Sequence, residues 1–346
     1  MDDAGSAGIL PAFCPAIRRQ DGGAPGDERA GIKIGIGRDM KDACEKRVVI
    51  AGGTGFIGRA LAKELRARNY AVIVLTRKAR ARDDGIEEVE YSPGGIGEWI
   101  KHLDRAAAVV NLAGRGINCQ HTPENLREIR DSRVSSVQTL AMAIDHTPRP
   151  PRVWVQAGAI GIYGDRHDVL CDEDSPAGND ALAEICKAWE KTFFNVPAPR
   201  TRRVLMRIGM VLGRDGGALP ALDRLTTFFL GGSFGDGRQY MSWVSLADVT
   251  GAFIAAIERE DWTGTYNLVA PNPATNNEFM AELRRVLHRP WSPPAPAWAI
   301  NIGARLLKME PSLALTGCRC APKRLLESGF KFQYPDLPSA FMKLYE

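Results

Sequence analysis

The sequence predicts an α/β fold: a doubly wound parallel sheet with helices on both faces, followed by a smaller C-terminal domain. Short apolar runs recur along the chain, as is typical of parallel strands that are buried on both faces. Segments with helical periodicity separate these runs, and a glycine-rich turn follows the first of them. Because strands that alternate with helices form parallel sheets covered on both sides, these observations together indicate the fold class.

The expected elements follow in order from Arg47. Apolar runs predict strands at 48–50, 71–75, 109–113, 153–157 and 204–208. Helices are expected at 59–69, around Trp99 and at 123–144, the last with proline in its first turn. From Pro271 onward, two helical stretches flank the proline-rich segment 290–296.

Three regions are expected along the chain. Residues 1–45 lack any sustained periodicity and are rich in glycine, alanine and proline, which predicts a disordered N-terminal extension; Met40 is a candidate natural start. Residues 46–213 form the predicted nucleotide-binding domain. Residues 214–346 form the substrate-side and C-terminal domain, which returns to the sheet at about 240–270.

Composition narrows the classes of partner. The net charge of +4 is mild and the basic residues are scattered, which disfavours nucleic acid but suits a phosphorylated small molecule. Seven cysteines without regular spacing predict reduced thiols, with neither a disulfide framework nor a metal site. The chain lacks an apolar stretch of membrane-spanning length and a signal peptide, so we expect a cytoplasmic protein without a membrane partner.

The glycine-rich turn carries the main functional signal. Gly53-x-Gly55-x-x-Gly58 satisfies the dinucleotide fingerprint, and Gly52 gives a second version of the same spacing. The glycines permit a sharp turn, close approach to a pyrophosphate and tight packing of the helix on the strand, as in Rossmann-type folds. ATP or GTP hydrolysis is disfavoured because Arg59 and Ala60 occupy the positions of the lysine and the hydroxyl residue of a triphosphate-binding loop.

The end of the second strand indicates which dinucleotide is bound. NAD enzymes place an acidic residue there for the ribose 2′-hydroxyl, whereas a cation accommodates a 2′-phosphate. Here the strand ends in Thr76 and Arg77, the latter 19 residues beyond Gly58, and Asp83 and Asp84 come too late. The sequence therefore predicts NADP(H).

These segments resemble the extended short-chain dehydrogenase/reductase superfamily, and more narrowly its atypical epimerase family. The resemblance extends over about residues 47–340. Its further segments are 110–114, 132–134, 162–165, 189–190, 207–213, 235–239, 243–248 and 266–268. Residues 315–317, 321–324 and 329–330 are similar to the appended domain of unknown function of that family.

The resemblance implies a set of cofactor contacts. They are Gly52, Thr54, Gly55, Phe56, Ile57, Gly58, Thr76, Arg77, Leu112, Ala113, Glu128, Arg133 and Val211. Core packing is an equal alternative for Leu112, Ala113 and Val211. Glu128 and Arg133 have the alternative of a solvated helix face, although Arg133 matches the family motif.

The usual catalytic pair of the superfamily, Tyr-x-x-x-Lys, is absent from the chain. By resemblance, its tyrosine and lysine positions fall near Leu182 and Cys186, the serine position at Gly158 and the asparagine position at Arg133. Two substitutes are available, Tyr163 and Lys187, but a packed aromatic and an exposed helix residue are the preferred interpretations of these two. Arg238, Tyr240 and Trp243 match the substrate loop of the superfamily, where Arg238 binds either an anionic substrate or a surface carboxylate.

Two functions remain open from the sequence. The first is an NADP(H)-dependent oxidoreductase or nucleotide-sugar epimerase-like enzyme, which acts on an unidentified small molecule without the usual catalytic pair. The alternative is a catalytically silent, NADP(H)-responsive regulator or assembly factor. A homodimer is compatible with either.

Overall fold

A seven-stranded sheet forms the centre of the computed structural model, which describes residues 46–346. Its order is β11-β7-β5-β4-β1-β2-β3, and all neighbours run parallel. The strands are β1 Arg47–Ala51, β2 Ala71–Thr76, β3 Glu87–Glu90, β4 Ala108–Asn111, β5 Val153–Ala159, β7 Arg202–Ile208 and β11 Gly264–Leu268. The order reverses between β1 and β4, where open α/β sheets bind ligands. The predicted fold class is confirmed; the predictions for residues 1–45, disorder and a start at Met40, lie outside the described residues.

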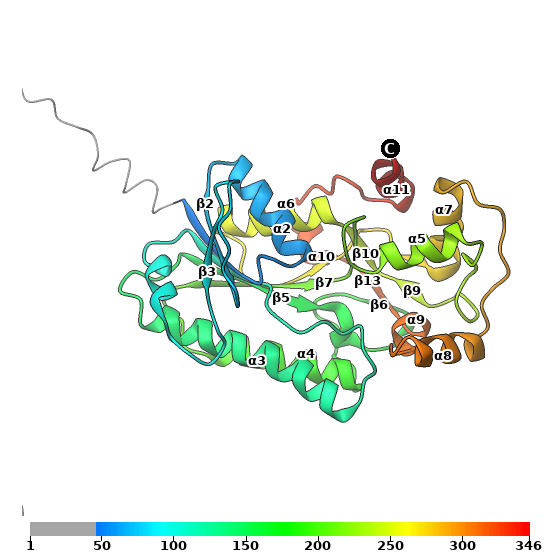
Figure 1. The fold of residues 1–346 in the computed structure, drawn as a ribbon, viewed down its shortest axis with the longest axis horizontal. Helices are drawn as coiled ribbons and strands as arrows, with labels where there is room; N and C mark the ends of the chain where they lie inside the picture. The colour runs from blue at the N-terminus through cyan, green and yellow to red at the C-terminus, as the bar shows by residue number, and fades with distance from the viewer. Residues whose placement is uncertain (1–45) are drawn as a thin grey trace, which may run out of the picture. The chain divides into compact units, whose positions relative to one another are not determined.

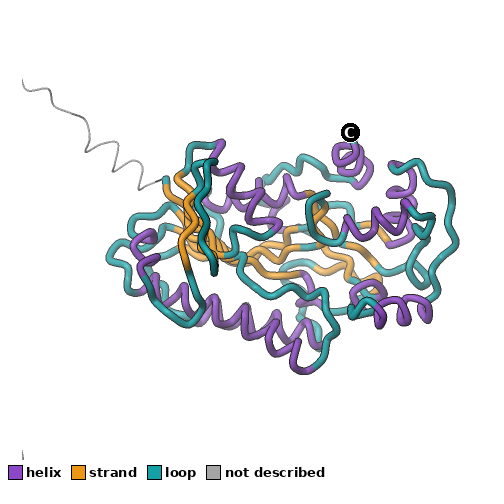
Figure 2. Tube along the Cα trace, in the orientation of Figure 1, coloured by secondary structure: helices purple, strands orange, loops and turns teal. Residues whose placement is uncertain are grey.

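Helices cover both faces of this sheet (Figures 1 and 2). On one face lie α2 (Phe56–Ala67) and α6 (Leu246–Glu258), and on the other lie α3 (Pro123–Asp145) and α4 (Ala181–Asn195). The core therefore divides into two layers. One contains Leu61, Leu65 and Phe253, and the other contains Leu140, Trp154 and Phe193.

The central domain differs from the sequence prediction in several details, among them the short strands β6 (His167–Cys171) and β8 (Met210–Leu212), which were not predicted. The edge strand β3, of sequence Glu-Glu-Val-Glu, was not predicted, because charged edge strands discourage further pairing and therefore lack an apolar run. Helix α2 begins at Phe56, three residues before the predicted start at 59, because its first turn lies inside the glycine motif. The short helix predicted around Trp99 is the 3₁₀ helix η1, Glu98–Leu103.

The C-terminal part of the chain contains several short elements. Its helices are α5 Leu219–Thr227, α7 Asn276–Val286, α8 Ala297–Leu306, α9 Ser312–Leu315, α10 Lys323–Glu327 and α11 Leu337–Tyr345. The sequence predicted α7 and α8, on either side of 290–296, but not the helices after α8. No helix in the described residues 46–346 is long and apolar enough to cross a membrane.

Three small sheets lie beside the large one: the first two named here join the C-terminal part to the central domain, and the third lies within the C-terminal part. They pair β6 His167–Cys171 with β13 Cys318–Cys320, β8 Met210–Leu212 with β10 Trp243–Ser245, and β9 Tyr240–Met241 with β12 Ala274–Thr275. The chain also rejoins the large sheet through β11, within the stretch that the sequence assigned to this return. The proposed division at 213 itself stays a prediction.

Candidate functional site

The glycine turn brings the end of β1 against the end of β4. Gly52 has φ +80°, which favours glycine, and a Cβ there would lie 2.8 Å from the carbonyl carbon of Leu112. A Cβ at Gly58 would lie 2.5 Å from the Gly52 oxygen. The two glycines therefore have different roles: Gly52 allows the turn, and Gly58 allows α2 to pack directly on it.

The start of α2 is suited to binding an anion. Gly55 is the N-cap residue, so no side chain caps the helix, and its first turn contains no acidic residue. The N–H groups of that turn have no partner within the helix and carry the positive end of its dipole. Arg59, which was not among the predicted cofactor contacts, extends over the turn and donates to the Thr54 oxygen at 2.9 Å.

Cations lie at the end of β2. Thr76 is half-buried there, and Arg77 and Lys78 are exposed. Within residues 46–346 neither cation forms an ion pair, whereas Arg82 contacts both Asp84 and Glu88. Arg82 thus occupies Asp84 and Glu88. The binding of a 2′-phosphate by Arg77 stays a prediction.

A buried polar network shapes the loop after β4. The Asn111 amide donates to Ser136 Oγ at 3.1 Å and to Gln156 Oε1 at 3.0 Å. Its own oxygen accepts the Ala113 N–H at 3.1 Å, which fixes the turn that holds Leu112 and Ala113 beside Gly52. Both residues are half-buried, and Leu112 also packs against the two core layers. This geometry is compatible with either of the roles considered for them.

Glu128 and Arg133, on α3, both hold the segment that follows Ala113. Glu128 pairs with Arg115. Arg133 donates to the backbone oxygens of Arg115 and Ile129 at 2.9 and 3.0 Å, and its guanidinium lies 5.1 Å from the centre of the Trp189 ring. Burial lowers the pKa of Arg133. A solvated face is therefore the wrong interpretation for Arg133.

Val211 and Phe56 lie beside a second glycine-rich loop, residues 213–217, which packs against the start of α2. Val211 is buried in β8, as in its core-packing interpretation. The Phe56 ring packs so closely against the following loop that a Cβ at Gly213 or at Gly216 would lie 2.6 Å from it. The loop consequently covers the start of α2.

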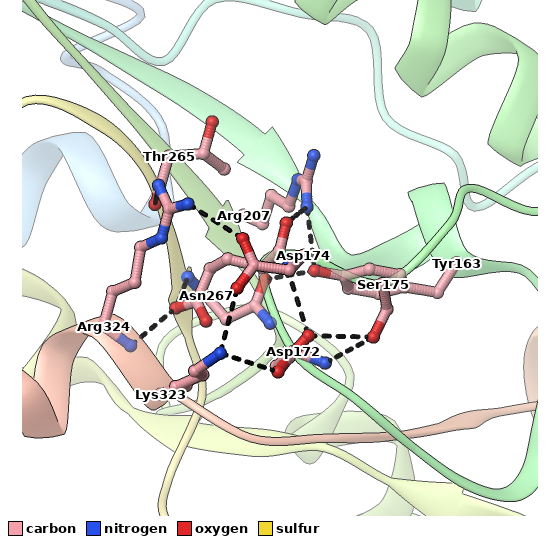
Figure 3. A network of polar contacts seen from close by, with 10 residues as sticks. Tyr163, Asp172, Asp174, Ser175, Arg207, Thr265, Asn267, Lys323 and Arg324 are labelled. Carbon is pink, nitrogen blue, oxygen red and sulfur yellow. Dashed lines mark hydrogen bonds and ion pairs between the residues drawn. The ribbon is translucent and has the colours of Figure 1, made fainter.

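Tyr163 belongs to a buried network rather than to an open site (Figure 3). Its hydroxyl donates to Asn267 Oδ1 at 2.7 Å and accepts from Arg207 at 2.8 Å. Arg207 also donates to both carboxylate oxygens of Glu190, at 2.9 and 2.8 Å. Burial raises the pKa of the Tyr163 hydroxyl. The geometry thus favours the packed-aromatic interpretation of Tyr163, with a structural hydroxyl.

The positions of the missing catalytic pair lie on α4. Cys186 is buried, and burial raises the pKa of its thiol to about 12, which disfavours the nucleophilic thiolate. Lys187 pairs with Glu184 on the helix surface, so it has the exposed-helix role. Leu182 is half-buried on the same helix.

The three predicted substrate residues do not form one surface. Arg238 is exposed and lies 4.0 Å from Asp168, which matches its surface-carboxylate interpretation. Tyr240 stacks with Arg319, whose guanidinium carbon is 5.3 Å from the ring centre. Trp243 is fully buried among core residues, so its side chain packs rather than contacts a ligand. Assigning Trp243 to the substrate site is therefore wrong for this conformation.

A cavity of about 530 Å³ lies at the opposite, amino edge of the sheet, between Tyr70, Arg152, Arg202 and Glu258. It is remote from the glycine turn, and chemistry at the carboxyl edge does not involve it. The glycine turn at Gly52–Gly58, rather than this cavity, therefore marks the candidate functional site.

Taken together, the sheet order and the glycine turn define a nucleotide-binding α/β protein of the Rossmann class. Residues 48–190 match the NAD dependent epimerase/dehydratase family, and residues 295–344 match a domain of unknown function, DUF1731.

Several related proteins match most of the chain. An Arabidopsis thaliana protein, "Epimerase family protein SDR39U1 homolog, chloroplastic", is 36% identical over 86% of this chain and 86% of its own length. The Bacillus subtilis epimerase family protein YfhF is 32% identical over 86% of this chain and 97% of its own. The crystal structure of human SDR39U1 (isoform 2) with NADPH matches with a TM-score of 0.77 and 31% identity, over 86% of this chain and 99% of that one. The chain belongs to the epimerase family of SDR39U1-like proteins, and the resemblance stated from the sequence is confirmed.

Proposed function

We propose that this protein binds NADP(H) at the carboxyl edge of its sheet and acts as an oxidoreductase or epimerase-like enzyme on a small molecule. The observation that carries the proposal is the uncapped, glycine-lined start of α2, together with Arg77 at the end of the neighbouring strand, which forms no ion pair within residues 46–346. The NADPH in the related human structure supports the same cofactor. The cytoplasmic location expected from the sequence stays a prediction.

The proposal assigns a separate task to each part of the cradle. The first-turn N–H groups of α2 bind the pyrophosphate, and Arg77 binds the 2′-phosphate of the adenosine ribose. The loop held by Asn111 and Arg133 orients the middle of the dinucleotide. When bound, the nicotinamide supplies or accepts a hydride, while the proton follows a route other than a Tyr-x-x-x-Lys pair.

The test is calorimetric titration of the full chain and of Arg77→Ala with NADPH and NADH. Losing a charge-assisted contact to phosphate costs about 1.5–3 kcal/mol, so Arg77→Ala should weaken NADPH binding by roughly tenfold or more. NADH lacks the 2′-phosphate and should lose little. Lys63→Ala, which removes an exposed charge from the outer face of α2, is the matched control and should bind both as the wild type does. Equal losses for NADPH and NADH in Arg77→Ala would contradict the assignment.

A second candidate function is a catalytically silent, NADP(H)-responsive regulator or assembly factor. The observation in its favour is that Tyr163 is hydrogen-bonded in a buried network and Lys187 is paired on the helix surface, so neither is poised as a proton donor. NADPH consumption is measured with purified protein across a panel of carbonyl compounds and nucleotide sugars. Turnover of any member supports the enzyme. Tight NADPH binding without turnover, together with capture of a partner only in the presence of NADPH, supports the regulator.

A further inference from the structure

Helix α8 presents an apolar face to solvent. Trp298, Ile302 and Leu306 are spaced by four residues, which places them along one side of the helix. They are 68%, 55% and 79% exposed, and no residue of α8 is buried. Such a stripe normally faces a core, so its exposure over the full length of α8 marks a surface that another body covers.

The segment that leads into α8 continues this surface. Trp291 is 74% exposed, and residues 289–295 run beside the chain that follows α5. The contacts that join them are the bridge between Phe234 and Ala295 and the stacking of Arg289 on Phe229, at 5.4 Å from the ring centre. Figure 1 shows this segment descending from α7 to α8 along one end of the molecule.

The charged residues of this segment are all cations. Residues 283–309 contain arginine at 284, 285, 289 and 305 and lysine at 308, and they contain neither aspartate nor glutamate. Glu310, which follows the segment, accepts the His121 N–H at 3.2 Å. Arg305 and Lys308 are exposed beside the apolar stripe, and within residues 46–346 neither forms an ion pair. Arg285 differs, because it pairs with Glu282.

We propose that α8 and its leading segment, residues 289–309, form a docking surface for an anionic membrane. A helix that combines tryptophan and leucine on one face with flanking cations is typical of segments that lie in the membrane interface. Tryptophan is favoured at that depth because its ring is apolar and its N–H is polar. Cations within a Debye length of anionic lipids add to the binding.

Charge favours this occupant over a second copy of the chain. In a twofold dimer through α8, the same cations would face one another without a carboxylate from this segment, and like charges oppose that contact. The inference differs from the sequence expectation of no membrane partner. That expectation rested on the absence of a spanning stretch, which peripheral docking does not require.

The test is sedimentation of the full chain with large unilamellar vesicles, either of phosphatidylcholine alone or with about 30% phosphatidylglycerol. The wild type should sediment with the anionic vesicles and much less with the neutral ones, and binding should weaken at about 0.5 M salt. The double variant Ile302→Ser, Leu306→Ser should lose roughly tenfold or more in vesicle partitioning, because two apolar side chains no longer enter the interface. The matched control Val169→Ser, Leu170→Ser alters side chains of similar exposure on β6 and should bind as the wild type does.

Circular dichroism and NADPH titration of each variant show whether the fold is retained. Binding that is the same for neutral and anionic vesicles, or no binding to either, would overturn the proposal. So would wild-type partitioning by the α8 variant. A concentration-dependent dimer in analytical ultracentrifugation that the α8 variant abolishes, without vesicle binding by the wild type, would assign this face to a second copy instead.

Discussion

The hydroxyl of Tyr163 forms two hydrogen bonds: it accepts one from Arg207 and donates one to Asn267. Replacing this tyrosine by phenylalanine leaves the buried Asn267 Oδ1 without its donor and removes one of the contacts of Arg207, which costs about 1–3 kcal/mol. We therefore expect Tyr163→Phe to lower the free energy of unfolding by this amount and to leave NADPH affinity nearly unchanged. Urea unfolding and calorimetry measure the two quantities.

Tyr334→Phe is the control, because no hydrogen bond to the Tyr334 hydroxyl is found within residues 46–346. The structural role of Tyr163 would be refuted by a variant that keeps full stability and loses turnover of an identified substrate. That result would return Tyr163 to the catalytic role considered from the sequence.

Glu173 is a buried carboxyl beside this network. One oxygen accepts the N–H groups of Asn267 and Arg324 at 2.9 and 3.3 Å, and the other has no partner within the described residues. Burial raises the pKa of Glu173 above its ordinary value of 4.5. A raised pKa in the folded state favours the protonated form. The contribution of this group to stability is therefore present below pH 4.5 and is lost as the pH rises through the folded-state pKa.

Glu173→Gln removes this titration while keeping an oxygen acceptor. The stability of the variant relative to the wild type should therefore increase as the pH rises from about 4.5 to 8, the window above the unfolded pKa. Urea unfolding at several pH values gives the difference directly. A stability difference that stays constant across this range would show that Glu173 has an unperturbed carboxyl.

At the scale of elements, two glycines at the start of α2 have different roles. Gly58 is needed for the helix to pack on the turn, and Gly55 leaves room for a ligand. A Cβ at Gly58 would meet the Gly52 oxygen at 2.5 Å, so Gly58→Ala must displace the helix. Gly55 has φ −74°, and its nearest contact would be 3.3 Å away, so the protein alone tolerates alanine there much better. A methyl group at Gly55 would instead obstruct a pyrophosphate that approaches the backbone.

We expect Gly58→Ala to reduce both stability, by about 1–3 kcal/mol, and NADPH affinity. Gly55→Ala should reduce NADPH affinity with little loss of stability. Thermal unfolding without ligand, compared with calorimetric titration, distinguishes the two variants. If Gly55→Ala bound NADPH as the wild type does, the proposed path of the pyrophosphate would be wrong.

At the scale of the molecule, the features predicted from the sequence are those that neighbouring residues determine. The strands with apolar runs, the glycine turn and Arg77 at the end of β2 each follow from a few consecutive side chains. Asn111 could not be placed in this way, because its partners Ser136 and Gln156 lie 25 and 45 residues away. The pairing of Arg207 with Glu190 likewise depends on how β7 and α4 pack, and the buried position of Trp243 depends on the whole C-terminal core.

Side chains of the C-terminal helices α10 and α11 are buried in two hydrophobic clusters that earlier parts of the chain also form. Leu325 of α10 is buried with Phe253 and Trp262, which lie against the large sheet. Phe341 of α11 packs edge-to-face on Phe279, with ring centres 5.1 Å apart. The Asp248 carboxylate accepts the backbone N–H groups of Gln333 and Tyr334, at 2.6 and 3.2 Å. These contacts make the C-terminal segment part of the hydrophobic core rather than an attached module.

Because the cores are shared, residues 46–346 should unfold as one cooperative unit. We expect urea transitions followed by tryptophan fluorescence and by far-ultraviolet circular dichroism to coincide. Removal of residues 295–346 would leave large apolar surfaces of both cores exposed, so the truncated chain should lose its cooperative transition and its NADPH binding. Two separate transitions in the intact protein, or a truncated chain that still binds NADPH, would show instead that the nucleotide-binding part is an independent domain.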